Sequence, residues 1–285
     1  MKKVVLTPNP YRDRNFRFVR EAAAVLEQSG IETRLCLAFD LNNGFELPSD
    51  LKFFDLKEEL RNADAMICFG GDGTILHSSK SACAANVPIL GVNIGTVGFM
   101  AELESSEMSL LSRLAADDYR EDPRMTLDVR LIHEGKEIAR EIALNDAVIT
   151  KGAVARVIQA SVHCDGTEAM NFSGDGVIIA TPTGSTAYSM SAGGPIVEPE
   201  AHSILITPIC AHEIRSRCIV VSSDRLVEVS VGRINRRNAF LSVDGGRAWR
   251  VFSGDRIVIS QSDQRVRLIR LKQHSFFETV NNKLK

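Results

Sequence analysis

Gly70-Gly71-Asp72-Gly73-Thr74 is the stretch that decides the fold of this chain. It follows the apolar run Ala65–Phe69 and precedes a helical pattern over Thr74–Ala85, after which Val87–Val92 has the composition of a second strand. A strand, a glycine turn, a helix and a further strand form a βαβ unit, and such a unit implies a parallel sheet. We therefore expect an α/β domain in this part of the chain.

The rest of the first half also alternates strand and helix patterns. Apolar residues at helical spacing predict a helix over residues 13–29, and Gly30 ends it. The other elements predicted here are strands at Val4–Thr7 and Ile31–Phe39 and helices near Leu56–Asn62 and Ser105–Ala116. We expect residues 1–123 to form a Rossmann-like α/β domain.

The pattern changes near Pro123 to short strands with alternating polar and apolar residues. This spacing predicts a β-sandwich over residues 124–264, with one short helix near Thr186–Ala192. A last strand and a helix with an apolar stripe follow, and we expect this tail, about 265–285, to join the first domain. The predicted strands are Leu127–Ile132, Ile138–Ala143, Ala147–Thr150, Val157–Val162, Val227–Val231 and Ile257–Ser260.

The composition excludes several classes of protein. The chain has 285 residues and a formal net charge of −2, so no global basic field points to nucleic acid. No apolar run reaches the roughly 20 residues needed to cross a bilayer, and the N-terminus does not resemble a signal peptide. The 6 cysteines show no C-x-x-C spacing, which favours reduced cysteines in a cytoplasmic protein over a zinc site.

The glycine turn has the composition of a phosphate site with one unexpected carboxylate. A strand-to-helix turn presents backbone N–H groups that attract anions, and glycines let the backbone approach a phosphate. Asp72 would repel a phosphate, so its presence suggests a site that also coordinates Mg²⁺ or accepts a proton from a hydroxyl. The turn lacks the Gly-Lys-Ser/Thr ending of a P-loop. A structural turn with Asp72 as a helix cap is the alternative.

Three shorter motifs carry weaker signals. Gly91–Phe99 misses the dinucleotide fingerprint because Asn93 occupies the middle glycine place, which counts against a hydride-transferring dehydrogenase. Asn145 and Asp146 could hold ribose hydroxyls, although a plain turn is the favoured interpretation of this pair taken alone. Val243–Gly246 predicts a hairpin turn and nothing functional by itself.

Residues 173–195 form the second informative stretch. A buried strand leads into a turn dense in hydroxyl groups and then into a short helix, which Ser185 or Thr186 could cap. The start of this helix would offer N–H groups and hydroxyls to a polar ligand, and Tyr188 could pack beside a base. We favour a binding site here over a turn with no function.

Taken together and in this order, these stretches resemble the NAD kinase family over nearly the whole chain. The motifs are GGDGT at 70–74, NIGTVGF at 93–99, LND at 144–146, DGVIIATPTGSTAYSMSAGGP at 175–195 and ITPIC at 206–210. Phosphofructokinases and diacylglycerol and sphingosine kinases share the first motif, whereas the TPTGSTAYSMSAGGP part is highly specific.

The resemblance implies a phosphotransferase that moves the γ-phosphoryl group of ATP to the 2′-hydroxyl of the adenosine ribose of NAD, giving NADP. It also implies dependence on Mg²⁺ or another divalent metal and a homo-oligomer, a dimer or a tetramer. Asp72 would be the general base. The other ligand-binding residues that the motifs imply are Gly73, His77, Asn145, Asp146, Arg156, Asp175, Thr183, Thr186, Ala187, Tyr188, Ser189, Met190 and Ser191.

Three residues depart from the family pattern: Asp146 stands where Glu is usual, Ser173 where a basic residue is common, and Gly246 where Gln or Asn is common. None of these departures affects the role that the resemblance implies for Asp72. Two alternatives stay open: a kinase of the wider GGDGT group that acts on a lipid or a sugar, and a non-catalytic NAD(P)-binding sensor.

Overall fold

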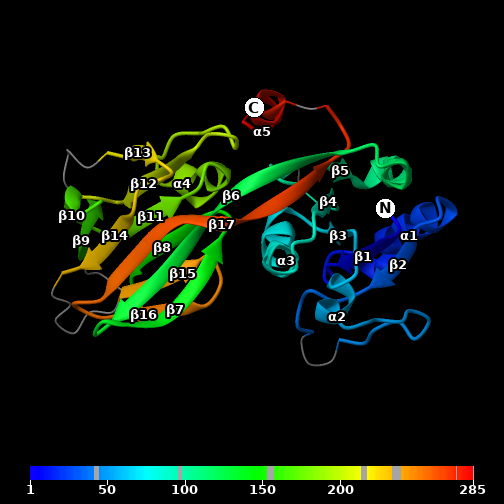
Figure 1. The fold of residues 1–285 in the computed structure, drawn as a ribbon, viewed down its shortest axis with the longest axis horizontal. Coiled ribbons are helices and arrows are strands. Elements are labelled where there is room, and N and C mark those ends of the chain that lie inside the picture. Colours follow the sequence, from blue (N-terminus) through cyan, green and yellow to red (C-terminus); the bar gives the residue numbers. More distant parts are fainter. Residues whose placement is uncertain are drawn as a thin grey trace. The chain divides into compact units, whose positions relative to one another are not determined.

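The chain forms two compact units in the computed structural model (Figure 1). Unit 1 contains Met1–Pro123 and Val266–Lys285, and unit 2 contains Arg124–Arg265. The structure describes residues 1–41, 45–95, 98–152, 157–212, 217–232, 239–273 and 275–284. No helix among these residues is long and apolar enough to cross a membrane.

Unit 1 is built on a parallel sheet. Its strands run in the order β2, β1, β3, β4, and β5 and the end of β17 also pair in parallel with β4. The strands β1, β3 and β4 are buried almost throughout, as expected for a parallel sheet with both faces covered. The strands of this unit are β1 (Lys3–Pro8), β2 (Glu32–Leu35), β3 (Ala65–Phe69), β4 (Ile89–Asn93), β5 (Leu103–Glu104) and β17 (Arg256–Arg270), which enters it at Val266.

Helices pack onto this sheet through apolar side chains. Val19 and Leu26 of α1 share a buried cluster with Leu6 of β1 and Leu111 of η2, whereas α3 packs against β3 and β4. The predicted α/β fold is therefore confirmed for this unit. Its helical segments are η1 (Arg14–Phe16), α1 (Arg17–Gln28), α2 (Leu56–Leu60), α3 (Asp72–Ala84), η2 (Ser105–Ala116) and α5 (Phe276–Lys283).

Helix α3 begins two residues earlier than the pattern predicts. The Gly71 carbonyl already accepts hydrogen bonds from the backbone N–H groups of Thr74 and Ile75, at 2.8 and 3.1 Å. Asp72 is consequently the first residue of the helix, and Gly71 occupies the cap position without any side-chain hydrogen bond. The helix-cap alternative for Asp72 is wrong.

Unit 2 is an all-β structure, which confirms the predicted β-sandwich. One antiparallel sheet has the order β13-β12-β11-β8-β15-β16, and the other strands include the antiparallel run β10-β9-β14-β17 and the hairpin β6–β7. Both sets send side chains into one core, for example Ile149 and Ile179 from the first and Val129, Val162 and Phe172 from the second. The bounds are β6 (Arg120–His133), β7 (Lys136–Ala143), β8 (Asp146–Lys151), β9 (Ile158–Cys164), β10 (Thr167–Gly174), β11 (Gly176–Ala180), β12 (Ser203–Ile209), β13 (Ile219–Ser222), β14 (Val227–Val231), β15 (Ala239–Val243) and β16 (Ala248–Val251), with the short helices η3 (Thr183–Thr186) and α4 (Tyr188–Ser191).

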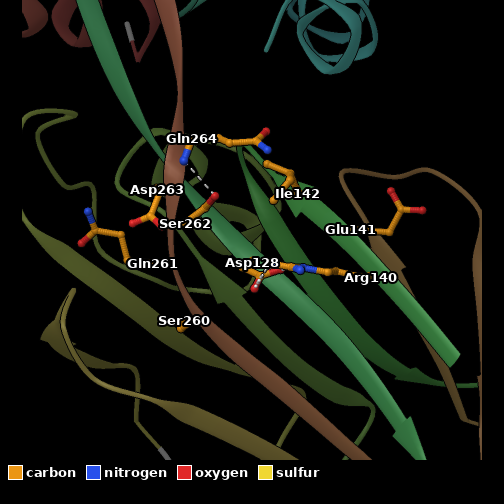
Figure 2. Close-up of a pocket in the computed structure, with 9 residues that line it drawn as sticks. All are labelled: Asp128, Arg140, Glu141, Ile142, Ser260, Gln261, Ser262, Asp263 and Gln264. Atoms are coloured by element: carbon orange, nitrogen blue, oxygen red, sulfur yellow. Dashed lines mark hydrogen bonds and ion pairs between the residues drawn. The ribbon is translucent and has the colours of Figure 1, made fainter. Parts of the chain in front are cut away.

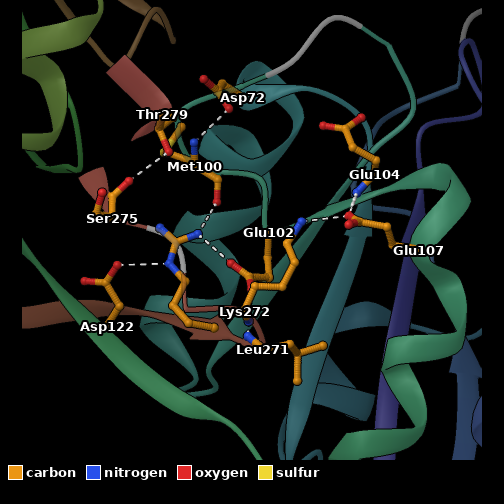
Figure 3. A network of polar contacts seen from close by, with 11 residues as sticks. Asp72, Met100, Glu102, Glu104, Glu107, Asp122, Leu271, Lys272, Ser275 and Thr279 are labelled. Atoms are coloured by element: carbon orange, nitrogen blue, oxygen red, sulfur yellow. Dashed lines mark hydrogen bonds and ion pairs between the residues drawn. The ribbon is translucent and has the colours of Figure 1, made fainter. Parts of the chain in front are cut away.

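Glu102 binds the segment that follows β17, where the chain has re-entered unit 1. Its Oε1 accepts hydrogen bonds from the backbone N–H groups of Leu271 and Lys272, at 2.7 and 2.6 Å (Figure 3). Its Oε2 lies 3.3 Å from the Arg270 guanidinium, which also donates to Asp122 at 3.0 Å. These side chains are nearly buried, so the pair is shielded from water and each partner depends on the other.

The apolar stripe predicted for the last helix is not buried. No residue of α5 is buried, and Phe277 is 62% exposed. The helix is instead defined by its start, where Ser275 and Glu278 form a reciprocal capping box.

Removing the Glu102 carboxylate should strongly destabilise the protein. We expect Glu102→Ala to lower the free energy of unfolding by about 3 kcal/mol, because Arg270 would lose a buried partner. The matched control is Glu228→Ala, which removes one half of the exposed pair with Arg256 and should cost about 1 kcal/mol or less. Urea unfolding of both variants measures the difference, and equal losses would contradict the role given to Glu102.

Candidate active site

A cavity of about 450 Å³ opens in unit 1 at the start of helix α3. Gly71, Asp72, Gly73 and Thr74 line it from the predicted glycine turn, and Gly98 lines it from the loop after β4. The remaining described lining residues are Asn9, Arg12, Phe39 and Lys283. The structure thus brings two of the sequence motifs together with the C-terminal helix.

The glycines of the turn serve two different purposes. A Cβ added to Gly70 would lie 2.1 Å from Thr74 Oγ1, so this glycine is required by packing within the protein. A Cβ added to Gly71 or Gly73 would meet no atom of the described residues within 4 Å, apart from those of its own neighbours in the chain. Nothing described in the fold therefore demands glycine at positions 71 and 73, and both glycines line the cavity.

The first turn of α3 also supplies hydrogen-bond donors. The initial N–H groups of an α-helix have no partner within the helix, and their dipoles favour an anion. Here they lie beside open glycine backbone at a cavity wall, which is a suitable place for a phosphate group.

Asp72 is fixed in the cavity by the loop after β4. Its Oδ2 accepts a hydrogen bond from the Phe99 N–H at 2.6 Å. Its Oδ1 accepts one from the Met100 N–H at 3.1 Å, which Figure 3 shows. A Cβ on Gly98 would lie only 1.9 Å from Asp72 Oδ1, so the close approach requires glycine there. Gly98 therefore has a structural role, to make room for Asp72.

Two cations balance this carboxylate among the described lining residues. Lys283 Nζ lies 3.9 Å from Asp72 Oδ2 and 4.1 Å from the centre of the Phe99 ring. Burial lowers the pKa of Lys283, and the charge of Asp72 opposes that shift. Arg12 is the second cation. The cavity therefore carries more positive than negative charge and suits an anionic ligand.

A second hollow, of about 560 Å³, lies in unit 2 between β6, β7 and β17 (Figure 2). Its described lining includes the carboxylates Asp128, Glu141 and Asp263 but only one cation, Arg140. Arg140 is already engaged, because its Nε and Nη2 donate to the two Asp128 oxygens at 2.8 and 3.0 Å. This hollow would repel a phosphate, so the cavity in unit 1 is the better candidate.

In unit 2, the hydroxyl-rich turn packs against the motif at residues 144–146, just before β8. Thr181 Oγ1 donates to the Leu144 carbonyl at 2.6 Å, and the Thr181 N–H donates to the Asn145 carbonyl at 2.9 Å. A Cβ on Gly184 would lie 2.1 Å from the Asn145 carbonyl oxygen, so the hydroxyl-rich turn packs directly on this backbone. Asn145 Oδ1 is buried and has no hydrogen-bond partner. Buried polar atoms usually have a hydrogen-bond partner, so this oxygen is a candidate contact for a ligand.

Asp244 organises the same segment, which the hairpin signal alone did not reveal. Its carboxylate accepts hydrogen bonds from the backbone N–H groups of Leu144, Asn145 and Asp146, at 2.8, 2.8 and 3.0 Å. Burial, together with this nearby carboxylate, raises the pKa of Asp146 to about 7. Asp146 is therefore partly protonated near neutral pH.

Most hydroxyls of the turn at 183–191 bind within the protein. Ser185 does not cap the short helix, because its Oγ donates to the Val197 carbonyl at 3.1 Å and accepts from the Val197 N–H at 3.0 Å. Ala187 occupies the cap position, so the predicted cap by Ser185 or Thr186 is wrong. The other internal bonds are Thr186 to the Thr183 carbonyl, Arg124 to Thr183 and Ser189 with Thr207.

The remaining candidates have varied surroundings. Tyr188 is 45% exposed, Ser191 is also exposed, and Ala187 and Met190 are partly exposed, so these four remain accessible. His77 Nε2 lies 2.6 Å from the Ala38 carbonyl oxygen and its ring stacks on Phe39, which itself lines the cavity. Asp175 pairs with Lys151 at 2.6 Å. Arg156 lies outside the described residues.

The described residues offer no preformed metal cage. No three His, Cys, Asp or Glu side chains in this part of the chain come close enough together to hold a metal ion.

Known proteins match both halves of the chain. The model of the ATP-NAD kinase N-terminal domain matches residues 9–119, and that of the C-terminal domain matches residues 144–271. The NAD kinase of Lachnoclostridium phytofermentans is 37% identical over 99% of this chain and 99% of its own length. The NAD kinase of Acetivibrio thermocellus is 34% identical over 100% of this chain and 97% of its own length.

Solved structures show the same fold. An NAD kinase from Archaeoglobus fulgidus in complex with ATP is 26% identical, with a TM-score of 0.76 over 100% of this chain and 98% of that chain. Yeast NADH kinase in complex with NADH has a TM-score of 0.86 over 100% of this chain and 87% of that chain, at 24% identity.

The raised pKa of Asp146 predicts a pH-dependent stability. The folded protein keeps the Asp146 proton up to a pH of about 7, whereas the ordinary value is 3.8, so the folded state binds more protons between these values. The free energy of unfolding should therefore fall as the pH rises through this window, by roughly 4 kcal/mol. Asp146→Asn should remove this fall in urea unfolding between pH 4 and 8. The exposed control Glu137→Gln should not, and parallel profiles for wild type and Asp146→Asn would contradict the assignment.

Proposed function

The chain belongs to the NAD kinase family, and we propose that it transfers the γ-phosphoryl group of ATP to the 2′-hydroxyl of the adenosine ribose of NAD, with Asp72 as the general base. The observation that carries the proposal is the cavity at the start of α3. There, open glycine backbone, helix N–H groups and one fixed carboxylate lie together. Phosphoryl transfer needs these elements, because it depends on positioning and on charge stabilisation.

We assign ATP to unit 1. The described residues leave the space beside Gly71 and Gly73 open, which supports close contact between this backbone and the phosphate chain. The surplus positive charge of Arg12 and Lys283 over Asp72 supports the binding of an anion. His77 contributes indirectly in this proposal, because it stacks on Phe39 at the cavity wall.

Asp72 has the geometry of a general base. Two backbone N–H groups hold its carboxylate in one orientation, so it does not need to reorganise when the hydroxyl arrives. In the proposed step, Asp72 takes the proton of the ribose 2′-hydroxyl while that oxygen bonds to the γ-phosphorus. The bond from the γ-phosphorus to the β–γ bridging oxygen breaks, and ADP leaves.

We propose that Mg²⁺ enters with ATP and offsets the charge of its phosphate groups. Mg²⁺ keeps several waters and usually needs only one or two carboxylates besides the substrate phosphates. The donor set fits this mode, since Asp72 lies at the cavity where the phosphates are proposed to bind.

We assign NAD binding to unit 2. Asn145 and Asp146 are proposed to hold ribose hydroxyls, supported by the unpaired buried Oδ1 of Asn145 and the partly protonated Asp146 carboxyl group. Tyr188 is exposed enough to lie beside a base. The other proposed NAD contacts are Arg156, Asp175, Thr183, Thr186, Ala187, Ser189, Met190 and Ser191. We also propose that the protein acts in the cytoplasm as a homo-oligomer, a dimer or a tetramer.

One assay separates this proposal from its alternatives. Purified protein with ATP, Mg²⁺ and NAD should form NADP. No NADP with tight NAD binding in calorimetry would favour a non-catalytic sensor, whereas phosphorylation of a lipid or a sugar in place of NAD would favour another kinase of the GGDGT group.

Asp72→Asn should fold and bind NAD but lose most of its turnover. We expect kcat to fall by about 10²- to 10⁴-fold, because the amide cannot accept the proton of the hydroxyl. Initial rates of NADP formation measure this loss, and calorimetry with NAD together with thermal unfolding controls for binding and folding. A rate near that of the wild type would rule out Asp72 as the base.

Comparing Gly73→Ala with Gly98→Ala should distinguish a glycine that leaves room for a ligand from a glycine that protein packing requires. The methyl group at position 73 would meet none of the described residues beyond its own helix turn, so the melting temperature should stay unchanged or rise while KM for ATP rises about tenfold. The methyl group at position 98 would collide with Asp72, so both stability and kcat should fall. Unchanged ATP kinetics in Gly73→Ala would contradict contact between this backbone and the phosphates.

A further inference from the structure

Lys283 brings a positive charge from the far end of the chain to the cavity. It is the last residue of α5, a helix with no buried residue, yet its own side chain is only 17% exposed. The ammonium group lies over the Phe99 ring and 3.9 Å from Asp72 Oδ2, and Asp72 lines the cavity. The helix therefore places one charged side chain into the candidate site.

The contact between Lys283 and Asp72 leaves the ammonium group able to bind another anion. At 3.9 Å, Nζ is farther from Asp72 Oδ2 than the 2.7–3.2 Å typical of a hydrogen bond. The Phe99 ring attracts the charge but offers no oxygen acceptor. A phosphate oxygen in the cavity would give this ammonium a shorter, charge-assisted hydrogen bond.

The position of Lys283 also reduces the repulsion between the Asp72 carboxylate and a bound phosphate. Phosphate groups that approach Asp72 are repelled by its carboxylate, and a cation beside that carboxylate offsets the repulsion. Because the general base must lie next to the hydroxyl that attacks the γ-phosphorus, a cation 3.9 Å from the base lies within reach of the transferred group. Arg12, the other cation of the cavity lining, lies beside Gly95, with its Nη1 3.3 Å from where a Cβ of that glycine would be.

Hydrogen bonds and an ion pair fix the segment that precedes α5. Glu102 and Glu107 bind the backbone N–H and the Nζ of Lys272, at 2.6 and 2.7 Å, and the Ser275 capping box then starts α5 (Figure 3). The match to the C-terminal family model ends at residue 271, so Lys283 lies beyond the residues that this model matches.

We propose that Lys283 is a catalytic residue of the phosphoryl transfer, and that its ammonium group binds a γ-phosphate oxygen of ATP as the phosphoryl group moves to the hydroxyl. The proposal rests on the proposed function. No proton leaves Lys283 in this step: the ammonium group moves from Asp72 to the phosphate oxygens and stabilises their charge while Asp72 accepts the proton.

The test compares Lys283→Met with Lys283→Arg in the full-length protein. Methionine keeps the length and the apolar stem but removes the charge, so kcat for NADP formation should fall about 100-fold. Affinity for ATP, measured by calorimetry with Mg²⁺ and without NAD, should fall about tenfold, while affinity for AMP should not change. Lys283→Arg should recover most of the ATP affinity. Lys57→Met, which removes an exposed cation of the same unit outside the cavity, should behave as wild type.

Two results would overturn the role of Lys283. Wild-type kcat and ATP affinity in Lys283→Met would show that the ammonium does not touch the phosphates. An equal loss of affinity for ATP and AMP, with a lowered melting temperature, would show a purely structural role. If the wild type forms no NADP, the proposed function fails, and the comparison of ATP with AMP still decides whether Lys283 binds the terminal phosphates.

Discussion

The pair of backbone hydrogen bonds from Phe99 and Met100 to the Asp72 carboxylate is the interaction on which the candidate site depends. Gly98 makes it possible by leaving no side chain in the way. The Met100 peptide is held from both sides, because its carbonyl accepts a hydrogen bond from Arg270 at 3.0 Å. Arg270 in turn is paired with Glu102 and Asp122, so the end of β17 and the position of Asp72 belong to one polar network.

This network explains why a carboxylate can stand at a phosphate site. The carboxylate is not free to turn toward the phosphates, and a cation from the C-terminal helix lies beside it. Unit 2 uses a carboxylate in a comparable way, since Asp244 accepts three backbone N–H groups and so shapes the segment that carries Asn145 and Asp146. In both units a buried or fixed acid arranges the backbone around a neighbouring binding group.

Local sequence patterns predicted the parts of the fold that local physics determines. The glycine turn between a buried strand and a helix, the alternating strands of unit 2 and the strand Val227–Val231 follow from periodicity and turn chemistry. Contacts between distant residues were not predictable in this way. The roles of Gly98, Asp244 and Lys283 depend on partners 26, 98 and 211 residues away, and Ser185 binds Val197 rather than its own helix because tertiary packing offered it a better partner.

The most direct measurement is a crystal structure of the protein with Mg²⁺ and a non-hydrolysable analogue of ATP. The phosphate chain should lie against the backbone of residues 71–74, with its terminal phosphate next to Asp72 and within hydrogen-bonding distance of the Lys283 ammonium group. A phosphate chain bound elsewhere, with the cavity at the start of α3 empty, would contradict the assignment of this cavity to ATP.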